Sequence, residues 1–310
     1  MPETEVALDL FLHWLTHAHE RQFRVAERSE SGAVATDGSA RLAIEVRSLL
    51  PVEDAEWLRR RENLEAALSE GLPGRYALWT PGGADLPRDE PWLSDLIDLF
   101  RKSAVRLGPR ERSYVPIPIK LYLRKVSDDG GVVTVSGGLN SYWARFTEHV
   151  TGTYDLDSRQ LHRLPESEEH LQELLDFIIA SSKEMQPGDV FEIETIDAWT
   201  LQRLEGEDGV AVIGTPPGNP EEQGLAVRRN FRRLLAEAGA KLREANPPTG
   251  SGQALRALVV SGHYARMEEE GATTALRGYD PQLYGGIDFV CLAADGLVKP
   301  LIQPRAVAPR

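Results

Sequence analysis

The spacing of hydrophobic residues changes from helical to strand-like within the first fifty residues. From residue 5 to 19 apolar side chains recur at helical spacing, which predicts one amphipathic helix. Three strand-like runs follow at 22–30, 32–36 and 40–50, and Asp37-Gly38 before the third is a strong hairpin signal. The third run is apolar on both sides of one carboxylate, Glu45, so it predicts a central strand covered on both faces.

A helix is predicted directly after this central strand. Pro51 ends the strand, Asp54 is a suitable N-cap, and Gly71 and Pro73 mark the end of a helix over residues 53–72. The apolar run RYALWT comes next. A β-helix-β step of this length favours parallel pairing of LAIEV with RYALW through a right-handed crossover.

The remaining chain alternates between β-rich and helical stretches. The expected elements are a helix at 92–107, antiparallel hairpins within 114–164, a helix from Ser167, a strand at 190–196, a helix at 221–244, and strands at 254–262 and 286–294. These elements predict an α/β protein with a core at 1–110, a β-rich insertion at 111–165, and a C-terminal α/β segment at 166–310 packed on the same sheet.

Composition excludes several classes of protein. A hydrophobic content of 41% in 310 residues excludes a mostly disordered chain. No apolar run reaches the ~18 residues of a membrane span, and the first residues lack the order of a signal peptide, so we expect a cytoplasmic protein without membrane contact. The single cysteine, Cys291, excludes a disulfide framework and a cysteine zinc site, and its apolar neighbours predict a buried side chain.

The order of elements over residues 5–80 resembles the core of the PD-(D/E)XK, or restriction-endonuclease-like, superfamily. The resemblance implies an α/β/α core that carries the β insertion and the C-terminal part. It also implies a Mg-dependent (or Mn-dependent) endonuclease or exonuclease that cleaves DNA or RNA, in restriction, repair or anti-phage defence. By this resemblance, Glu45 corresponds to the Glu of the Glu-x-Lys motif, Arg47 stands at the Lys position, and Glu20 corresponds to the helix acid.

The second metal-binding acid has two candidates. Asp37 lies eight residues before Glu45, but it also belongs to the hairpin turn, and Glu30 is closer to the place where the family's Asp usually lies. The expected metal ligands are therefore Glu45 with Asp37 or Glu30, supported by Glu20, and the expected catalytic residues are Glu45, Arg47 and Asp37. Arginine keeps the positive charge of the missing lysine but cannot accept a proton.

The opposite interpretation is that Glu45 serves structure alone. Residues two apart on a strand share a face, so Arg47 is able to neutralise Glu45 in a buried ion pair. The chain would then be a catalytically inactive nuclease-fold module for binding or assembly.

Several other charged groups are candidates for binding. Nucleic-acid phosphates are the expected partners of two arginine clusters, although neighbouring acids favour solvated helix faces as the alternative. The clusters are Arg59, Arg60, Arg61, Arg228, Arg229, Arg232 and Arg233. His13, His17 and Glu20 follow one helix face and allow a zinc site as a weaker alternative. The net charge of −13 is concentrated in the second half, which suits a protein partner.

Overall fold

The structure is a computed structural model that describes residues 3–29, 31–49, 53–165, 167–216, 224–244, 253–262, 276 and 279–304. The chain divides into two compact units, of which unit 1 comprises residues 1–113 and 200–310, and unit 2 comprises residues 114–199. Strands β5 (Arg112–Ser127) and β8 (Val190–Leu204) carry the chain from one unit to the other. Unit 2 is thus an insertion that ends well after the predicted boundary at residue 165.

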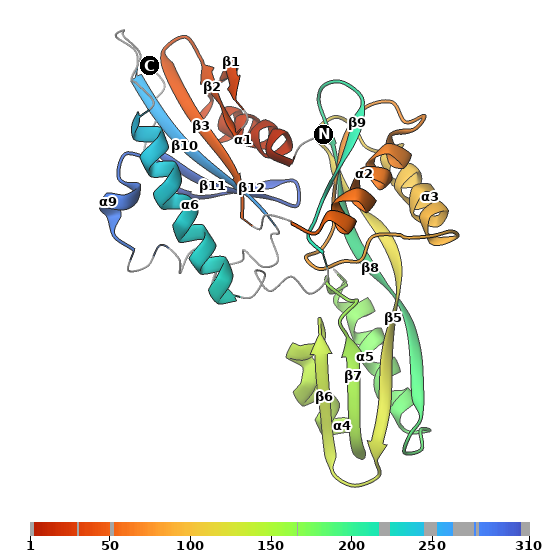
Figure 1. Ribbon diagram of the computed structural model, residues 1–310. Helices are drawn as coiled ribbons and strands as arrows, with labels where there is room; N and C mark the ends of the chain where they lie inside the picture. The colour runs from red at the N-terminus through yellow and green to blue at the C-terminus, as the bar shows by residue number, and fades with distance from the viewer. Residues whose placement is uncertain are drawn as a thin grey trace. The chain divides into compact units, whose positions relative to one another are not determined.

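Unit 1 contains a six-stranded mixed sheet in the order β1-β2-β3-β10-β11-β12 (Figure 1). Its first three strands form an antiparallel meander, β10 and β11 run parallel to β3, and β12 is antiparallel to β11. The bounds of these strands are β1 Arg24–Ser29, β2 Gly32–Thr36, β3 Ala40–Ser48, β10 Gln253–Ser261, β11 Phe289–Ala294 and β12 Leu297–Ile302. The predicted hairpin at Asp37-Gly38 is confirmed, with Gly38 at a positive φ of 85°.

Helices cover both faces of this sheet. On one face, α1 (Glu3–His19) packs its apolar stripe against residues such as Ile44 and Val259. On the other face, α6 (Gly224–Glu244) packs against Leu258 and Val290. The predicted first helix and the predicted coverage of the central strand on two faces are both confirmed.

The predicted partner of the central strand is wrong. β4 (Arg75–Trp79) pairs antiparallel with β8 and parallel with β9 (Gly209–Ile213), and the parallel neighbour of β3 is β10. β10 pairs with β3 over nine residues, and its last five residues are fully buried, so it covers the apolar edge of β3 more completely than the five-residue β4 would. The sequence prediction chose β4 because β4 is closer to β3 along the chain than β10 is.

The helices around β4 agree with the sequence. α2 (Ala55–Ser69) begins as predicted, with the Asp54 carboxylate accepting a hydrogen bond of 2.9 Å from the Trp57 amide. α2 packs on β9, however, and α3 (Trp92–Ala104) packs on α2, so neither helix crosses over the sheet that contains β3. The short helix α9 (Pro281–Tyr284) packs on α6.

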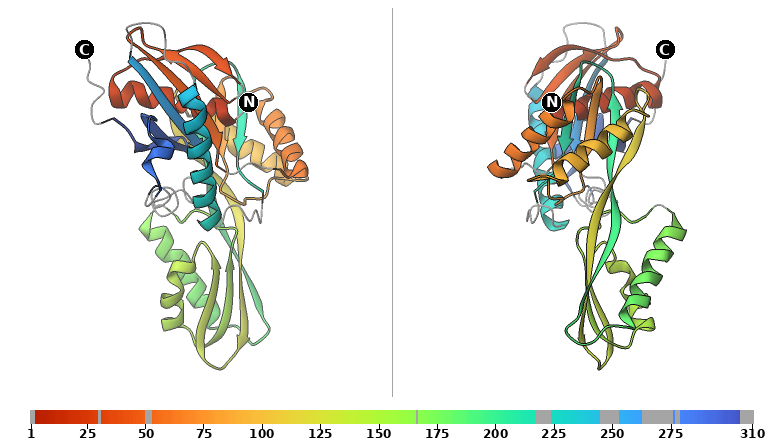
Figure 2. Two further views of the ribbon diagram at one scale, coloured as in Figure 1. Left: turned by 60° about the vertical axis from the view of Figure 1, so that its left-hand side comes forward. Right: turned by 90° about the vertical axis from the view of Figure 1, so that its right-hand side faces the viewer.

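Unit 2 is a sheet with helices on one face. β6 (Gly131–Gly137), β7 (Gly152–Ser158), β5 and β8 lie in that order, and α4 (Trp143–His149) and α5 (Glu168–Ser182) pack on them (Figure 2). The sequence predicted antiparallel hairpins here. β5 and β7 are antiparallel, but β6 and β7 are parallel, because a 3₁₀ turn at Asn140–Tyr142 and α4 return the chain between them. The mixed α/β class is confirmed, and among the described residues no helix has the length and apolar character to cross a membrane.

Candidate functional site

Glu45 lies on β3 on the face that α6 covers. The residue is 3% exposed, and its neighbours across the sheet are Gly32 on β2 and Leu258 on β10. A side chain at Gly32 would collide with β3, since a Cβ atom there would lie 2.0 Å from the Ile44 carbonyl oxygen. The glycine therefore permits the close approach of β2 to β3 beside Glu45.

Two cations neutralise the Glu45 carboxylate. Arg47, two residues along the same strand, places a guanidinium nitrogen 2.6 Å from Oε1. Lys241 on α6 places Nζ 2.9 Å from Oε1 and 2.8 Å from Oε2, and the same ammonium lies 2.7 Å from the Ser31 hydroxyl. The carboxylate is 4% exposed, whereas the side chains of Arg47 and Lys241 are 35% and 50% exposed. The cluster carries a formal charge of +1, and the side chains of its two cations are partly exposed.

This cluster does not fit a divalent cation. Both carboxylate oxygens of Glu45 already face ammonium or guanidinium nitrogens, and Mg²⁺ prefers several oxygen ligands. No group of three or more His, Cys, Asp or Glu side chains able to hold a metal occurs in the described part of the chain. A phosphate oxygen, by contrast, is a suitable ligand for the positive groups of Arg47 and Lys241.

Asp37 does not join Glu45. It caps the turn before β3, where its Oδ1 accepts hydrogen bonds from the Ser39 and Ala40 amides and its Oδ2 lies 2.5 Å from an Arg21 nitrogen. Burial opposes ionisation of Asp37, but these amides and the Arg21 guanidinium outweigh it and lower the pKa. Five residues of β3, roughly 17 Å, separate the turn from Glu45. The expected metal pairing of these two acids is corrected accordingly.

The other predicted ligands do not complete a site. Glu20 is exposed at the end of α1 with φ 54°, and α1 covers the face of the sheet opposite Glu45. Glu30 lies outside the described residues. The His13 and His17 rings make an edge-to-face contact with centroids 4.4 Å apart. Burial is the main cause that lowers the pKa of His13, and the positive charge of Arg110 lowers it further. Within the described ranges they gain no third metal-binding neighbour.

The first arginine cluster lies on the helix that follows β3 in the chain. Arg59, Arg60 and Arg61 lie on α2, which packs on β9. Arg60 forms ion pairs with Glu56 and Asp85, and the Arg61 guanidinium lies 5.7 Å from the Trp57 ring centroid. Arg60 and Arg61 are thus engaged in local contacts of α2, and phosphate binding by this cluster stays a prediction.

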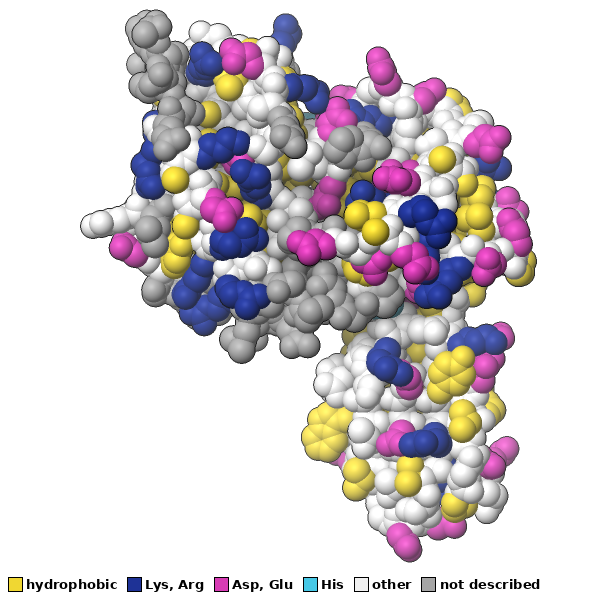
Figure 3. Space-filling model, in the orientation of Figure 1, with side chains coloured by type: hydrophobic (Ala, Val, Ile, Leu, Met, Phe, Trp, Pro, Cys, Tyr) yellow, Lys and Arg dark blue, Asp and Glu magenta, His cyan; other side chains and the backbone are white. Residues whose placement is uncertain are grey.

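The second arginine cluster lies on the helix that supplies Lys241. Arg229, Arg233, Glu237 and Lys241 follow at intervals of four residues and form one exposed row along α6, about 18 Å long. Figure 3 shows Lys and Arg side chains along the surface over α6. Arg228 and Arg232 lie on the same helix, and Arg232 stacks over Tyr279. Lys241 was not singled out from the sequence, although its spacing from Arg229 and Arg233 was the available signal.

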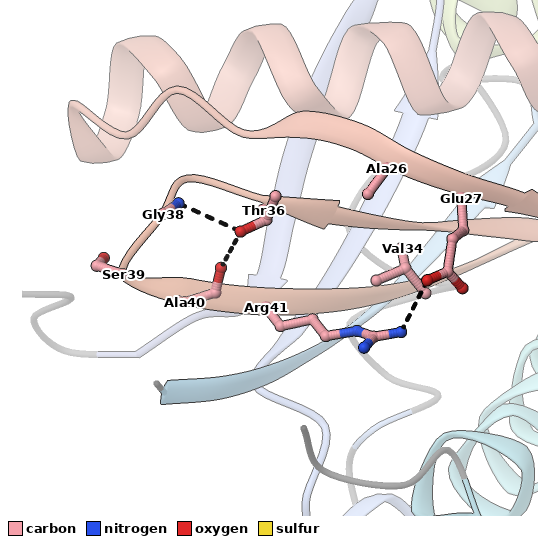
Figure 4. A pocket seen from close by; sticks show the side chains of 8 residues that line it. All are labelled: Ala26, Glu27, Val34, Thr36, Gly38, Ser39, Ala40 and Arg41. Atoms are coloured by element: carbon pink, nitrogen blue, oxygen red, sulfur yellow. Dashed lines mark hydrogen bonds and ion pairs between the residues drawn. The ribbon is translucent and has the colours of Figure 1, made fainter. Parts of the chain in front are cut away.

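A shallow hollow lies on the same face of the sheet as Glu45. Thr36, Val34 and Gly32 on β2 pair with Arg41, Ala43 and Glu45 on β3, and directly paired residues share a face. The hollow has a volume of about 320 Å³. Its lining is drawn in Figure 4: Ala26, Glu27, Val34, Thr36, Gly38, Ser39, Ala40 and Arg41. Arg41 is paired with Glu27 at 3.3 Å, so this end of the face is nearly neutral.

Comparison with protein-family models, with curated proteins and with solved structures finds no match to this chain.

Proposed function

We propose that the chain is a nucleic-acid-binding module with a nuclease-like core that does not hydrolyse its ligand. The observation that carries this proposal is the neutralisation of Glu45 by Arg47 and Lys241 at 2.6–2.9 Å. A carboxylate that is paired with two cations is a poor metal ligand, while cationic side chains that are partly exposed are good phosphate ligands.

The order of elements supports a nuclease-like core. In the sheet of unit 1, α1 and the antiparallel strands β1, β2 and β3 are accompanied by α6 and by β10. β10 lies next to β3 and runs parallel to it. This is the helix-meander-helix-strand order of the PD-(D/E)XK resemblance, with α6 in the place first expected for α2. The chain between β3 and α6 would then be an insertion into that core.

The α6 row supplies the electrostatic part of the proposal. Arg229, Arg233 and Lys241 outnumber Glu237 and leave a local charge of +2 on a chain with a net charge of −13. Phosphate contacts by such a row position a nucleic acid without reading its sequence. Three contacts predict that log K falls against log salt with a slope of about −2.7 for duplex DNA.

Binding is tested with fluorescently labelled duplex DNA, single-stranded DNA and RNA, by anisotropy over a range of salt concentrations in EDTA. We expect Arg233→Glu to weaken binding at least tenfold and to flatten the salt slope. Arg88→Glu is the matched control, because Arg88 is also an exposed arginine paired with a nearby acid, but in the loop before α3. Equal affinity of the wild type and Arg233→Glu for these nucleic acids would refute the assignment of the α6 row as their binding surface.

Hydrolysis is tested separately with plasmid DNA, linear DNA and RNA in Mg²⁺ and in Mn²⁺. We expect no cleavage by the wild-type protein or by Glu45→Gln. Cleavage by the wild type that disappears in Glu45→Gln would refute the non-catalytic proposal and restore the hydrolytic one.

A further inference from the structure

Unit 2 has a sheet face that no described helix covers. Along β5 and β8 the residues alternate, so that Leu121, Leu123 and Ile193 point into the core under α4 and α5 while the even-numbered residues point outward. Figure 2 shows α5 along one side of these strands and open space along the other. We call the outward side of β5, β6, β7 and β8 within unit 2 the open face.

The open face carries several exposed apolar side chains. Its exposed large side chains, with their exposed fractions, are Tyr122 (37%), Val126 (48%), Val132 (54%), Val190 (59%) and Ile196 (57%). Half of the ten exposed large hydrophobic residues among the described positions therefore lie on this one surface. Figure 3 shows such side chains between paired basic and acidic groups on the side of unit 2 that faces the reader. Several exposed apolar side chains gathered on one sheet face are a feature of interaction surfaces.

The charges of the open face are neutralised within the face. Lys120 lies 2.5 Å from Glu192, and Arg124 lies 2.6 Å from Asp155, in both cases across neighbouring strands. Arg159 pairs with Asp157 at 2.5 Å at the end of β7. With Glu194 included, three basic and four acidic groups give the face a formal charge of −1.

Unit 2 as a whole is far more acidic. Residues 114–199 contain seven basic and fifteen acidic side chains, a formal charge of −8. A polyanion would be repelled by this unit, and a strongly basic partner would find its complement on the helices and loops. The open face instead suits a partner surface that is apolar and close to neutral, because most of its own charges are paired.

We propose that the open face of unit 2 binds a second copy of this chain. A second copy presents the same apolar and internally neutralised surface, and a two-fold axis makes such a surface its own partner. Two sheets that pack face to face interdigitate their outward side chains, as in a β-sandwich. The inference does not depend on the function proposed for unit 1.

The size of the face is close to what a dimer requires. Unit 2 contributes 38 strand residues to the sheet. At about 3.3 Å per residue and about 4.8 Å between strands, they cover roughly 600 Å² of flat sheet. Stable interfaces bury about 800 Å² of accessible surface per partner, and accessible surface exceeds flat area on a face with projecting side chains.

Sedimentation velocity of the full chain over a wide range of protein concentrations tests the proposal. We expect a particle of twice the 34.4 kDa chain mass, and we expect Ile196→Lys and Val126→Lys to raise the dimer dissociation constant at least tenfold. Val105→Lys is the matched control, since Val105 is 79% exposed but lies in unit 1, and it should leave the dimer intact. A monomeric wild type at every concentration, or a dimer that both lysine variants leave unchanged, would overturn the proposal.

A second measurement does not rely on a disruptive substitution. Ile196→Cys introduces one accessible thiol, because the native Cys291 is buried, and Val105→Cys does the same outside the open face. We expect maleimide labelling of the first variant to slow at least fivefold as protein concentration rises, and labelling of the second to stay constant. Concentration-independent labelling at both positions would contradict a dimer through this face.

Discussion

Removing the ammonium of Lys241 is the most direct test of the charge cluster at Glu45. Lys241→Met preserves the length and the apolar stem of the side chain but removes its contacts with Glu45 and Ser31. Hydrogen bonds to buried charged groups contribute about 1.5–3 kcal/mol. Because Lys241 is half exposed and Arg47 remains in place, we expect a loss of about 1–2 kcal/mol in the free energy of unfolding.

Removing the acid should cost more. Glu45→Ala leaves Arg47 and Lys241 with like charges at one site and deletes a buried side chain, so we expect a loss of about 2–4 kcal/mol. In Glu45→Leu/Lys241→Met the carboxylate and one of its two cations are replaced by apolar groups. We expect that double variant to be more stable than the sum of Glu45→Leu and Lys241→Met predicts, with a coupling of at least about 1 kcal/mol.

Urea titrations followed by tryptophan fluorescence measure these differences. Lys102→Met serves as a control, because Lys102 is an exposed lysine on α3, and we expect a change within about 0.5 kcal/mol. Additive effects in the double variant would refute the ion-pair interpretation. A Glu45→Ala protein as stable as the wild type would do so as well, and would indicate a carboxylate kept for function at the expense of stability.

Three further predictions concern the rest of unit 1. Asp37→Asn should lower the free energy of unfolding by about 1–2 kcal/mol. The folded pKa of Asp37 lies below its ordinary 3.8, so the stabilisation by its carboxylate is complete above about pH 4 and is lost as pH falls through the folded pKa. Acid titration followed by circular dichroism should therefore show a shallower loss of stability in the variant than in the wild type. Gly32→Ala should lower stability by at least about 1–3 kcal/mol in a thermal melt, while Gly131→Ala, whose Cβ would meet its nearest atom at 3.8 Å, should stay within about 1 kcal/mol; equal effects would exclude the steric explanation. Burial raises the pKa of the Cys291 thiol, so a chromogenic disulfide reagent should label it only after urea unfolds the chain, and fast labelling of the native protein would contradict the packing of β11.

Local features of the fold could be predicted because their causes are local. The Asp54 carboxylate caps α2 through an amide three residues away, and the Asp37-Gly38 turn depends on a positive φ that glycine adopts freely. α4 was missed for a related reason, since Trp143–His149 is rich in aromatic and β-branched residues that resemble a strand when read alone. Its helix is stabilised by burial of Phe146 in the core of unit 2.

The candidate site could be predicted only in part because it is assembled from distant segments. Glu45 and Arg47 are neighbours on one strand, so their pairing was foreseen as an alternative to metal binding. Lys241 lies 196 residues from Glu45 along the chain, and nothing near Glu45 in the sequence points to it. The pairing of β3 with β10 had to be known first, and that pairing depends on competition between two apolar strands.

The long separation between β3 and β10 has a consequence for biosynthesis. Unit 2 is one continuous stretch, whereas the central strand of unit 1 gains its parallel neighbour only when residues 253–261 have been made. During translation unit 2 can fold while the apolar edge of β3 is still unpaired. High contact order of this kind slows folding, so unit 1 should mature last, and a nascent chain arrested before residue 253 should be a substrate for chaperones.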